Sequence, residues 1–526
     1  MGNRDIEAAR SYHEATQHTE RRLVEHPHYL DFAKQPLPYK VYTALEPIPL
    51  LRERRALEIP ALEALSIAAG EPAGKEIGKE IVDRVPDLSA LSRVLYFSAG
   101  ITKRKRIPGG GEVFLRAHAN TGALYHIDLY VVCGDLPGLP AGVYHFGPHD
   151  FALRRLREGD YRATLIEASG EQAELTHAPA ILVSASTYWR NAWKYQARAY
   201  RHCYWDAGTL HANLLAVGGT EGLAPRVVIG FADRPVERLL GLDPMKEGAL
   251  TLVPLGRTEA HPPPAPDVPE IHLETVPLSR HEVDYPAIRT MHAASSLESG
   301  AEAASWRRAT WRREPPPAQG RLYPLRSLKD EESPSESIEA VIQRRGSTRA
   351  FQREASISQQ ELTILLDRAS RELPTDFLVP ERESVLDLYL IVHAVDGLPP
   401  GAYYYRREER SLELLRKGDC RNQAGRLGLF QPLPADAAAN IYCLTDLDRV
   451  LTAWGNRGYR AAQLEGGIRG GRMYLAAYAQ RFGATGLTFL DEEVVDFFSP
   501  HAEGKSVMFL VAVGHSARRS ALARRS

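Results

Sequence analysis

Hydrophobic and polar positions along the chain predict helices and strands in alternation. Apolar residues that recur every three or four positions predict helices over residues 6–24 and 88–97 and a long helix over about 196–218. Nearly uninterrupted apolar runs predict buried strands over residues 123–133, 143–146, 180–186, 226–230 and 249–254. Prolines at 36, 38, 47 and 49 disfavour helix, so we expect the first helix to be followed by an extended arm.

The pattern occurs twice, at a constant offset of 259 residues. Residues 127–130 (IDLY) return as 386–389 (LDLY), and 198–201 (RAYR) return as 457–460 (RGYR). Two more matches share this offset, 139–144 with 398–403 and 156–160 with 415–419. Solenoid repeats are only about 20–50 residues long, so this period indicates a duplicated domain. Two copies of one fold can pair about a pseudo-twofold axis and build sites between them.

The repeat predicts five segments. They are an N-terminal helix and extended arm (1–60), a first domain (61–257), a proline-rich linker (258–335), a second domain (336–516) and a basic tail (517–526). Two domains of roughly 200 residues fit the usual domain size. Strands of these lengths, joined by hairpin-like LPxG turns, favour an α+β sheet flanked by helices over a doubly wound sheet.

Composition excludes some functions. The chain has 65 Lys and Arg against 66 Asp and Glu, so no overall field attracts nucleic acid or a membrane surface. Its four cysteines have no CxxC spacing and are no disulfide framework for 526 residues. We find no signal-peptide pattern and no run of about 18 apolar residues, and therefore expect a cytoplasmic protein.

A candidate anion site lies at the start of the second domain. Arg345, Ser347 and Arg349 alternate along a short extended stretch, so their side chains point to one face. Two guanidinium forks and a hydroxyl suit a phosphate. Ser358 and Glu361 then form a capping-box pattern that starts a helix. The alternative interpretation is a solvated basic helix end.

These motifs resemble a known family. The sequence RRGSTRAF followed by a capped helix resembles the opening of nitroreductase-fold flavoproteins, in which RxSxR holds the FMN phosphate. Residues 116–126 (RAHANTGALYH) and 189–201 (WRNAWKYQARAYR) are similar to a Pro-Ser-x-Gly loop and a Lys-Tyr-Gly-x-Arg-x-Tyr-Arg block of the azoline-oxidising SagB/ThcOx-type dehydrogenases. The resemblance covers about 61–257 and 336–516 and the YHEATQHT opening. It implies two nitroreductase-like domains in tandem that form an intramolecular pseudo-dimer.

The resemblance implies FMN as cofactor and assigns roles to residues of both domains. Lys194 and Tyr195 would be the catalytic acid/base pair; desolvation would lower the lysine pKa and the neighbouring ammonium would lower that of the tyrosine. Without the resemblance, the pair is equally explained as two side chains at a solvated helix end. The implied cofactor-binding residues are Arg345, Ser347, Arg349, Arg116, Asn120, Thr121, Gly122, Thr485, Gly486 and Leu487.

The two copies keep different parts of this constellation. The second has Ala453-Trp454 where the first has Lys194-Tyr195, and the first has no RxSxR before its first helix. In two-chain members of the resembling fold the flavin lies at the interface. We therefore expect one composite FMN site per chain, its phosphate held by the second domain and its ring served by the first, with a decayed symmetry mate; two FMN is the alternative. Ala119-Asn120, Gln196 and Thr209 depart from the family pattern and leave the substrate open.

Three functions follow from the resemblance and its departures. The first is an FMN-dependent oxidoreductase that moves a hydride from substrate to flavin N5, similar to azoline-to-azole oxidases of modified-peptide biosynthesis. The others are an NAD(P)H-dependent nitro or quinone reductase and a non-catalytic flavin-binding scaffold. We expect a small-molecule or peptide substrate, with a peptide-presenting partner as one option, and no nucleic-acid, membrane or metal partner, because the histidines lack ligand spacing. Four glycines within 466–471 predict a close approach of the equivalent helix from the first copy.

Overall fold

The fold consists of two antiparallel sheets with helices between and around them. The computed structural model describes residues 2–53, 56–67, 83–106, 111–326, 336–378 and 384–517. One sheet has the strand order β1-β6-β5-β4-β7-β8 and the other β14-β15-β13-β10-β11-β12-β9, and a separate hairpin pairs β2 with β3. The strands are β1 Pro47–Pro49, β2 Ile101–Arg106, β3 Glu112–Arg116, β4 Ile127–Cys133, β5 Gly142–Gly147, β6 Ala152–Glu158, β7 Ala180–Thr187, β8 Glu247–Leu255, β9 Arg321–Pro324, β10 Asp387–Val392, β11 Gly401–Arg406, β12 Ser411–Lys417, β13 Ala439–Thr445, β14 Gly483–Gly486 and β15 Ser506–Gly514. The predicted α+β tandem pseudo-dimer is confirmed.

The duplication extends to the arms. Five strands follow the same antiparallel path in both sheets, β6-β5-β4-β7-β8 in one and β12-β11-β10-β13-β15 in the other, and a short strand, β1 or β9, closes the edge beyond β6 or β12. The proline-rich segment 258–335 contains β9 and two helices, α10 and α11. Each half therefore receives an edge strand from the segment that precedes it. The helices are α1 Glu7–Ala15, α2 Glu20–Glu25, α3 Ala61–Ala64, α4 Leu88–Ala99, α5 Arg162–Ala168, α6 Ala173–Thr176, α7 Tyr188–Tyr195, α8 Ala199–Thr220, α9 Asp233–Leu240, α10 Pro286–Ala294, α11 Gly300–Arg307, α12 Ile338–Arg344, α13 Gln359–Ser370, α14 Arg421–Leu427, α15 Pro432–Asp436, α16 Leu447–Trp454, α17 Asn456–Ala479 and α18 Asp491–Phe498, with 3-10 turns at Phe32–Lys34, Thr121–Ala123 and Gln196–Arg198.

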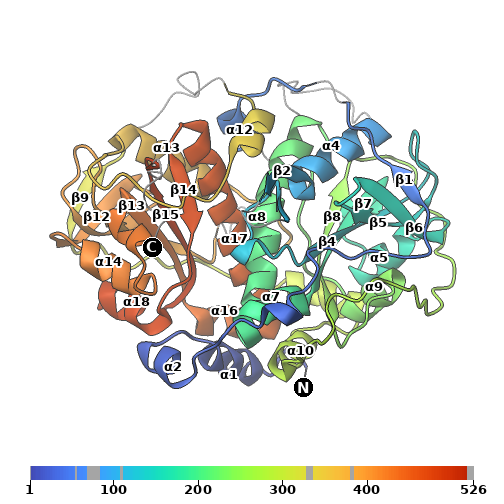
Figure 1. The fold of residues 1–526 in the computed structure, drawn as a ribbon, viewed down its shortest axis with the longest axis horizontal. Helices are drawn as coiled ribbons and strands as arrows, with labels where there is room; N and C mark the ends of the chain where they lie inside the picture. The colour runs from blue at the N-terminus through green and yellow to red at the C-terminus, as the bar shows by residue number, and fades with distance from the viewer. Residues whose placement is uncertain are drawn as a thin grey trace.

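Helices α8 and α17 form the centre of the molecule, between the two sheets (Figure 1). A Cβ atom at Gly467 would lie 2.5 Å from the carbonyl oxygen of Trp205, and one at Gly208 would lie 2.6 Å from the Gly467 Cα. Gly471 likewise faces Ala212 of α8, whereas Gly466 and Gly470 face β15. The predicted close approach is therefore made by two of the four glycines, and the other two let the sheet pack against α17.

Buried ion pairs interlock the two halves. Arg198 and Arg201 on α8 bind Asp491 at the start of α18, with N–O distances of 2.9 and 2.6 Å. The equivalent Arg457 and Arg460 on α17 bind Asp233 at the start of α9, each at 2.6 Å. Each half therefore neutralises the buried arginines of the other, and the Arg-x-Tyr-Arg motif has a structural role in both.

Several local predictions differ from the structure. The helix expected over 6–24 is two helices, α1 and α2, separated by residues 16–19. The strand expected over 226–230 forms only isolated bridges, Val227 with Thr375 of the second half and Val228 with Leu252. The β2–β3 hairpin was not expected. The tail beyond residue 517 lies outside the described residues. Among the described helices, none combines the length and apolar character needed to cross a membrane.

Candidate functional site

The predicted phosphate-binding segment begins where α12 ends. The Arg345 side chain is buried and reaches into the first half, where Nε donates to the Ala117 carbonyl at 3.0 Å and Nη2 donates to the Arg116 carbonyl at 3.3 Å. Burial lowers the pKa of Arg345. None of the described carboxylates forms an ion pair with it, in contrast to Arg198, Arg201, Arg457 and Arg460 of α8 and α17. The carbonyls satisfy two of its donors but do not neutralise its charge, so the position suits an anionic ligand.

The turn that contains Thr485, Gly486 and Leu487 lies beside this segment. The Ser347 hydroxyl is 3.1 Å from the Tyr474 hydroxyl, and the Gly486 N–H donates to the same Tyr474 oxygen at 2.5 Å. Thr485 is buried, and the Leu487 N–H is bonded to Leu510 within the sheet. Tyr474, which sequence reasoning missed, therefore joins two predicted parts of the site.

The predicted catalytic pair ends helix α7 and meets the second half. Lys194 is partly buried, and burial and then the positive charge of Arg349 lower its pKa. For Tyr195, burial and then the negative charge of Asp206 raise the pKa, although Arg349 acts in the opposite direction. The expected lowering of the lysine pKa is confirmed, and that of the tyrosine is wrong, because burial outweighs the neighbouring cations.

The loop 116–122 brings its members close to Tyr195. Gly122 adopts φ +65°, and a Cβ atom there would be 3.0 Å from the Tyr195 hydroxyl. The Thr121 N–H and hydroxyl donate to Asp206 at 2.9 and 2.8 Å. Asn120 accepts from the Tyr125 N–H at 2.7 Å, while its own buried Nδ2 has no hydrogen-bond partner among the described residues. This orphaned donor is a second group that a bound ligand would satisfy.

The Arg116 side chain points away from this group of residues. Its Nη1 donates to the Ile127 carbonyl at 3.2 Å and its Nη2 donates to the Pro38 carbonyl at 2.6 Å, and the guanidinium lies over the Tyr125 ring. Its backbone carbonyl, by contrast, accepts from Arg345. Arg116 therefore contributes to the arrangement through its main chain and anchors the N-terminal arm with its side chain.

Two pairs of cations each join one residue of the first half to one of the second. Lys194 of the first half lies within electrostatic range of Arg349 of the second, and Lys103 of β2 within range of Arg345. None of these four forms an ion pair within the part of the chain that the structure describes. Cations without an ion-paired carboxylate suit an anionic ligand such as a phosphate. Lys103 escaped prediction because the run KRKR at 103–106 is typical of a solvated loop.

Gln196, directly after the predicted catalytic pair, has a strained backbone. Its φ of +51° and ψ of −141° belong to a region that glycine favours. The equivalent residue of the second half, Gly455, adopts nearly the same angles, +66° and −161°. Glutamine thus replaces glycine without a change of backbone path, at a cost of about 1–3 kcal/mol. Strain of this kind is common beside functional groups.

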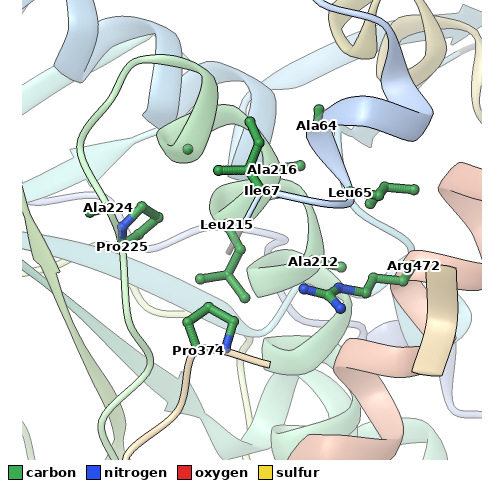
Figure 2. Close-up of a pocket in the computed structure, with 11 residues that line it drawn as sticks. Ala64, Leu65, Ile67, Ala212, Leu215, Ala216, Ala224, Pro225, Pro374 and Arg472 are labelled. Atoms are coloured by element: carbon green, nitrogen blue, oxygen red, sulfur yellow. The ribbon is translucent and has the colours of Figure 1, made fainter. Parts of the chain in front are cut away.

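The position equivalent to Tyr474 in the first half has an apolar side chain. Leu215 of α8 occupies this place, and Ile67 is 3.2 Å from where a Cβ atom of Gly219 would lie. A cavity lined by these residues measures about 10 Å³, and Figure 2 shows the Arg472 guanidinium at its edge. Such a volume holds about one water molecule. Of the region 67–88, which has no RxSxR, residues 68–82 lie outside the described part of the chain.

Comparison with known proteins supports a nitroreductase fold for both halves. Residues 342–515 match the model of the nitroreductase family. They form a nitroreductase-family domain. The crystal structure of a candidate nitroreductase from Anabaena variabilis superposes on the whole molecule with a TM-score of 0.75, at 25% identity, covering 97% of this chain and 99% of that one. The tandem arrangement thus has a counterpart of the same extent.

Two curated proteins are similar in part. A candidate nitroreductase of Methanocaldococcus jannaschii is 26% identical over 170 residues, which are 32% of this chain and 80% of that protein. The trifolitoxin-processing protein TfxB of Rhizobium leguminosarum bv. trifolii is 28% identical over 179 residues, 33% of this chain. The match spans 48% of TfxB.

Proposed function

We propose that the protein is an FMN-dependent dehydrogenase with one composite cofactor site between its halves. The observation that carries the proposal is that Lys194 lies within electrostatic range of Arg349, and Lys103 of Arg345, while none of the four forms an ion pair with a described carboxylate. Each pair contains one residue from each half. The second half has Ala453 and Trp454 in place of Lys194 and Tyr195, which supports one FMN per chain over two.

The residues present fit FMN. Arg345, Ser347 and Arg349 would hold the phosphate, since guanidinium forks pair with phosphate oxygens. The free Nδ2 of Asn120 is a donor for a polar edge of the ring system. Thr121, Gly122, Thr485, Gly486 and Leu487 would line the ring through their main chain and small side chains. When bound, FMN supplies the redox chemistry by accepting a hydride at N5.

Lys194 and Tyr195 would have different roles, Lys194 in proton transfer and Tyr195 in hydrogen bonding. The lowered pKa of Lys194 increases the fraction of neutral amine near neutral pH, so this side chain is the one that can accept a substrate proton. The raised pKa of Tyr195 keeps its hydroxyl protonated, which makes it a hydrogen-bond donor that orients the substrate. Thr121 fixes Asp206, whose charge contributes to that raised pKa.

The similarity to TfxB, named for trifolitoxin processing, supports a peptide or peptide-like substrate and a biosynthetic partner that presents it. The second candidate function is reduction of nitro compounds or quinones by NAD(P)H, which the two nitroreductase relatives favour. Purified yellow protein distinguishes the two. Bleaching by NADPH alone supports the reductase, and indifference to nicotinamide with turnover of an azoline peptide supports the dehydrogenase.

The cofactor assignment is tested by flavin absorbance per chain after denaturation. We expect one FMN per chain in the wild type and folded, colourless protein for Arg345→Ala and Arg349→Ala, because each loses a charge-assisted contact of about 1.5–3 kcal/mol. Arg104→Ala and Arg106→Ala remove exposed cations of the neighbouring hairpin and should leave occupancy unchanged. Full flavin content in both Arg345→Ala and Arg349→Ala would refute the assignment.

Lys194→Ala separates catalysis from binding. The variant should keep the flavin and lose most of its turnover, because among the described residues no second lysine with a lowered pKa lies beside Tyr195. Unchanged turnover with flavin bound would favour the non-catalytic scaffold.

A further inference from the structure

Lys103 crosses from the first half to the phosphate-binding segment of the second. It lies on β2 at a register shift between Ile101 and Lys103, where the pairing with β3 is irregular. A bulge of this kind redirects a side chain. The Lys103 ammonium donates to the carbonyls of Arg344 and Arg345 at 2.9 and 2.6 Å. The next three residues of the strand are basic and exposed.

The ammonium still has one N–H to offer. It carries three donors, and two of them hold the carbonyls. A Cβ atom at Gly346, in the middle of the RRGS turn, would be 4.0 Å from Nζ. The remaining donor therefore lies at the turn that precedes Ser347, on the side of the molecule where the two halves meet.

We infer that Lys103 is a third cationic group of the phosphate end of the cofactor site, supplied in trans by the first half. The inference rests on the proposed function. The Lys103 side chain holds the turn through the carbonyls of Arg344 and Arg345 and adds a positive charge beside Arg345. Binding of the phosphate would then require both halves, as binding of the ring does.

The surroundings of Lys103 favour a charge role over a purely structural one. A lysine that only clamps carbonyls needs no anion, yet Lys103 is crowded by Arg345, Lys105 and Arg344. Burial and these charges lower its pKa to about 8. A phosphate dianion would offset the repulsion and restore the charged form. Above about pH 8 the unliganded ammonium loses its proton, so the affinity for FMN should fall there.

The test uses the full-length apoprotein and two ligands that differ only in the phosphate, FMN and riboflavin, titrated by fluorescence quenching. The variants are Lys103→Met, Lys103→Arg, and Arg106→Met as a control that removes an exposed cation of the same strand. We expect Lys103→Met to bind FMN about 10- to 100-fold more weakly and riboflavin within about twofold of wild type, with Lys103→Arg recovering most of the loss. Arg106→Met should resemble wild type.

The pH profile gives a second readout. Wild type should lose FMN affinity between pH 7 and 9.5, whereas Lys103→Arg should not, because arginine keeps its charge. If Lys103→Met lowers the affinities for FMN and riboflavin equally, Lys103 only holds the two carbonyls, and the inference is overturned. An unchanged affinity for FMN would also overturn it. A wild type that binds riboflavin but gains nothing from the phosphate would also overturn it. A wild type that binds neither flavin would overturn the proposed function, and this inference with it.

Discussion

The sharpest stability prediction concerns Asp491, whose carboxylate neutralises two buried arginines of the other half. It accepts from Arg198 at 2.9 Å and Arg201 at 2.6 Å, and from the His18 N–H at 2.8 Å. Asp491→Asn keeps the shape and removes the charge. Both guanidiniums would then be buried without a counter-charge.

The magnitude follows from two independent considerations. Breaking a buried ion pair by removal of one partner costs about 3–5 kcal/mol. These surroundings also lower the pKa of Asp491 to about 2, against an unfolded value of about 3.9, which corresponds to about 2–3 kcal/mol of stability. This contribution is fully present above the unfolded pKa and is lost as the pH falls toward 2. We expect Asp491→Asn to lower the free energy of unfolding by about 3 kcal/mol or more.

Urea denaturation followed by circular dichroism measures the effect, with Asp448→Asn as the matched control. Asp448 pairs with Arg10 at 2.8 Å, but both side chains are largely exposed, and exposed pairs contribute about 0–1 kcal/mol. Asp233→Asn, which removes the equivalent carboxylate from Arg457 and Arg460, should match Asp491→Asn. If the Asp491 and Asp448 variants unfold at the same urea concentration, the buried pairs do not hold the halves together.

The remaining predictions concern packing and acid sensitivity. Gly467→Ala should destabilise the protein by about 1–3 kcal/mol although alanine is the better helix former, because its Cβ would lie 2.5 Å from the Trp205 carbonyl oxygen. Gly2→Ala is the control, since a Cβ atom there would have nothing within 4 Å. Equal thermal midpoints for the two variants would contradict the close approach of α8 and α17. Burial lowers the pKa values of His118 and His202 well below the usual range and that of His18 to about 3. Below the unfolded pKa of about 6.5, these histidines take up a proton in the unfolded chain but stay neutral in the folded protein. The free energy of unfolding should therefore fall by about 1.4 kcal/mol per histidine for each pH unit below about 6.5. Urea midpoints that are the same at pH 7 and pH 5 would show that these histidines are not buried as described.

The repeat made the architecture predictable. The offset of 259 residues identified equivalent positions, and together with the family resemblance it led to the expectation that Lys194 of one half and Arg349 of the other serve one site. The sequence pattern also predicted a long helix over about 196–218, and the structure has α8 there with every residue buried. A helix pattern is a local feature and the offset is a repeated one, and a single sequence shows both.

What escaped prediction depends on contacts between distant segments. Lys103 looks like part of a solvated basic run until a strand irregularity turns it toward the carbonyls of Arg344 and Arg345. The pKa of Tyr195 depends on Asp206 and on burial, neither of which follows from the adjacent lysine. Residues 226–230 have the composition of a strand, but they form only single bridges, Val228 with Leu252 of β8 and Val227 with Thr375 of the other half.

The replacement of Tyr474 by Leu215 at the equivalent position has an evolutionary consequence. When a dimer is built from two identical polypeptides, one gene change alters both of its clefts, so neither can be abandoned without harm to the other. Fusion into a single polypeptide removes that constraint. With one proposed cofactor site per chain, the other cleft is free to become hydrophobic interior, and the two halves can differ at equivalent positions such as Gln196 and Gly455, which a symmetric dimer could not.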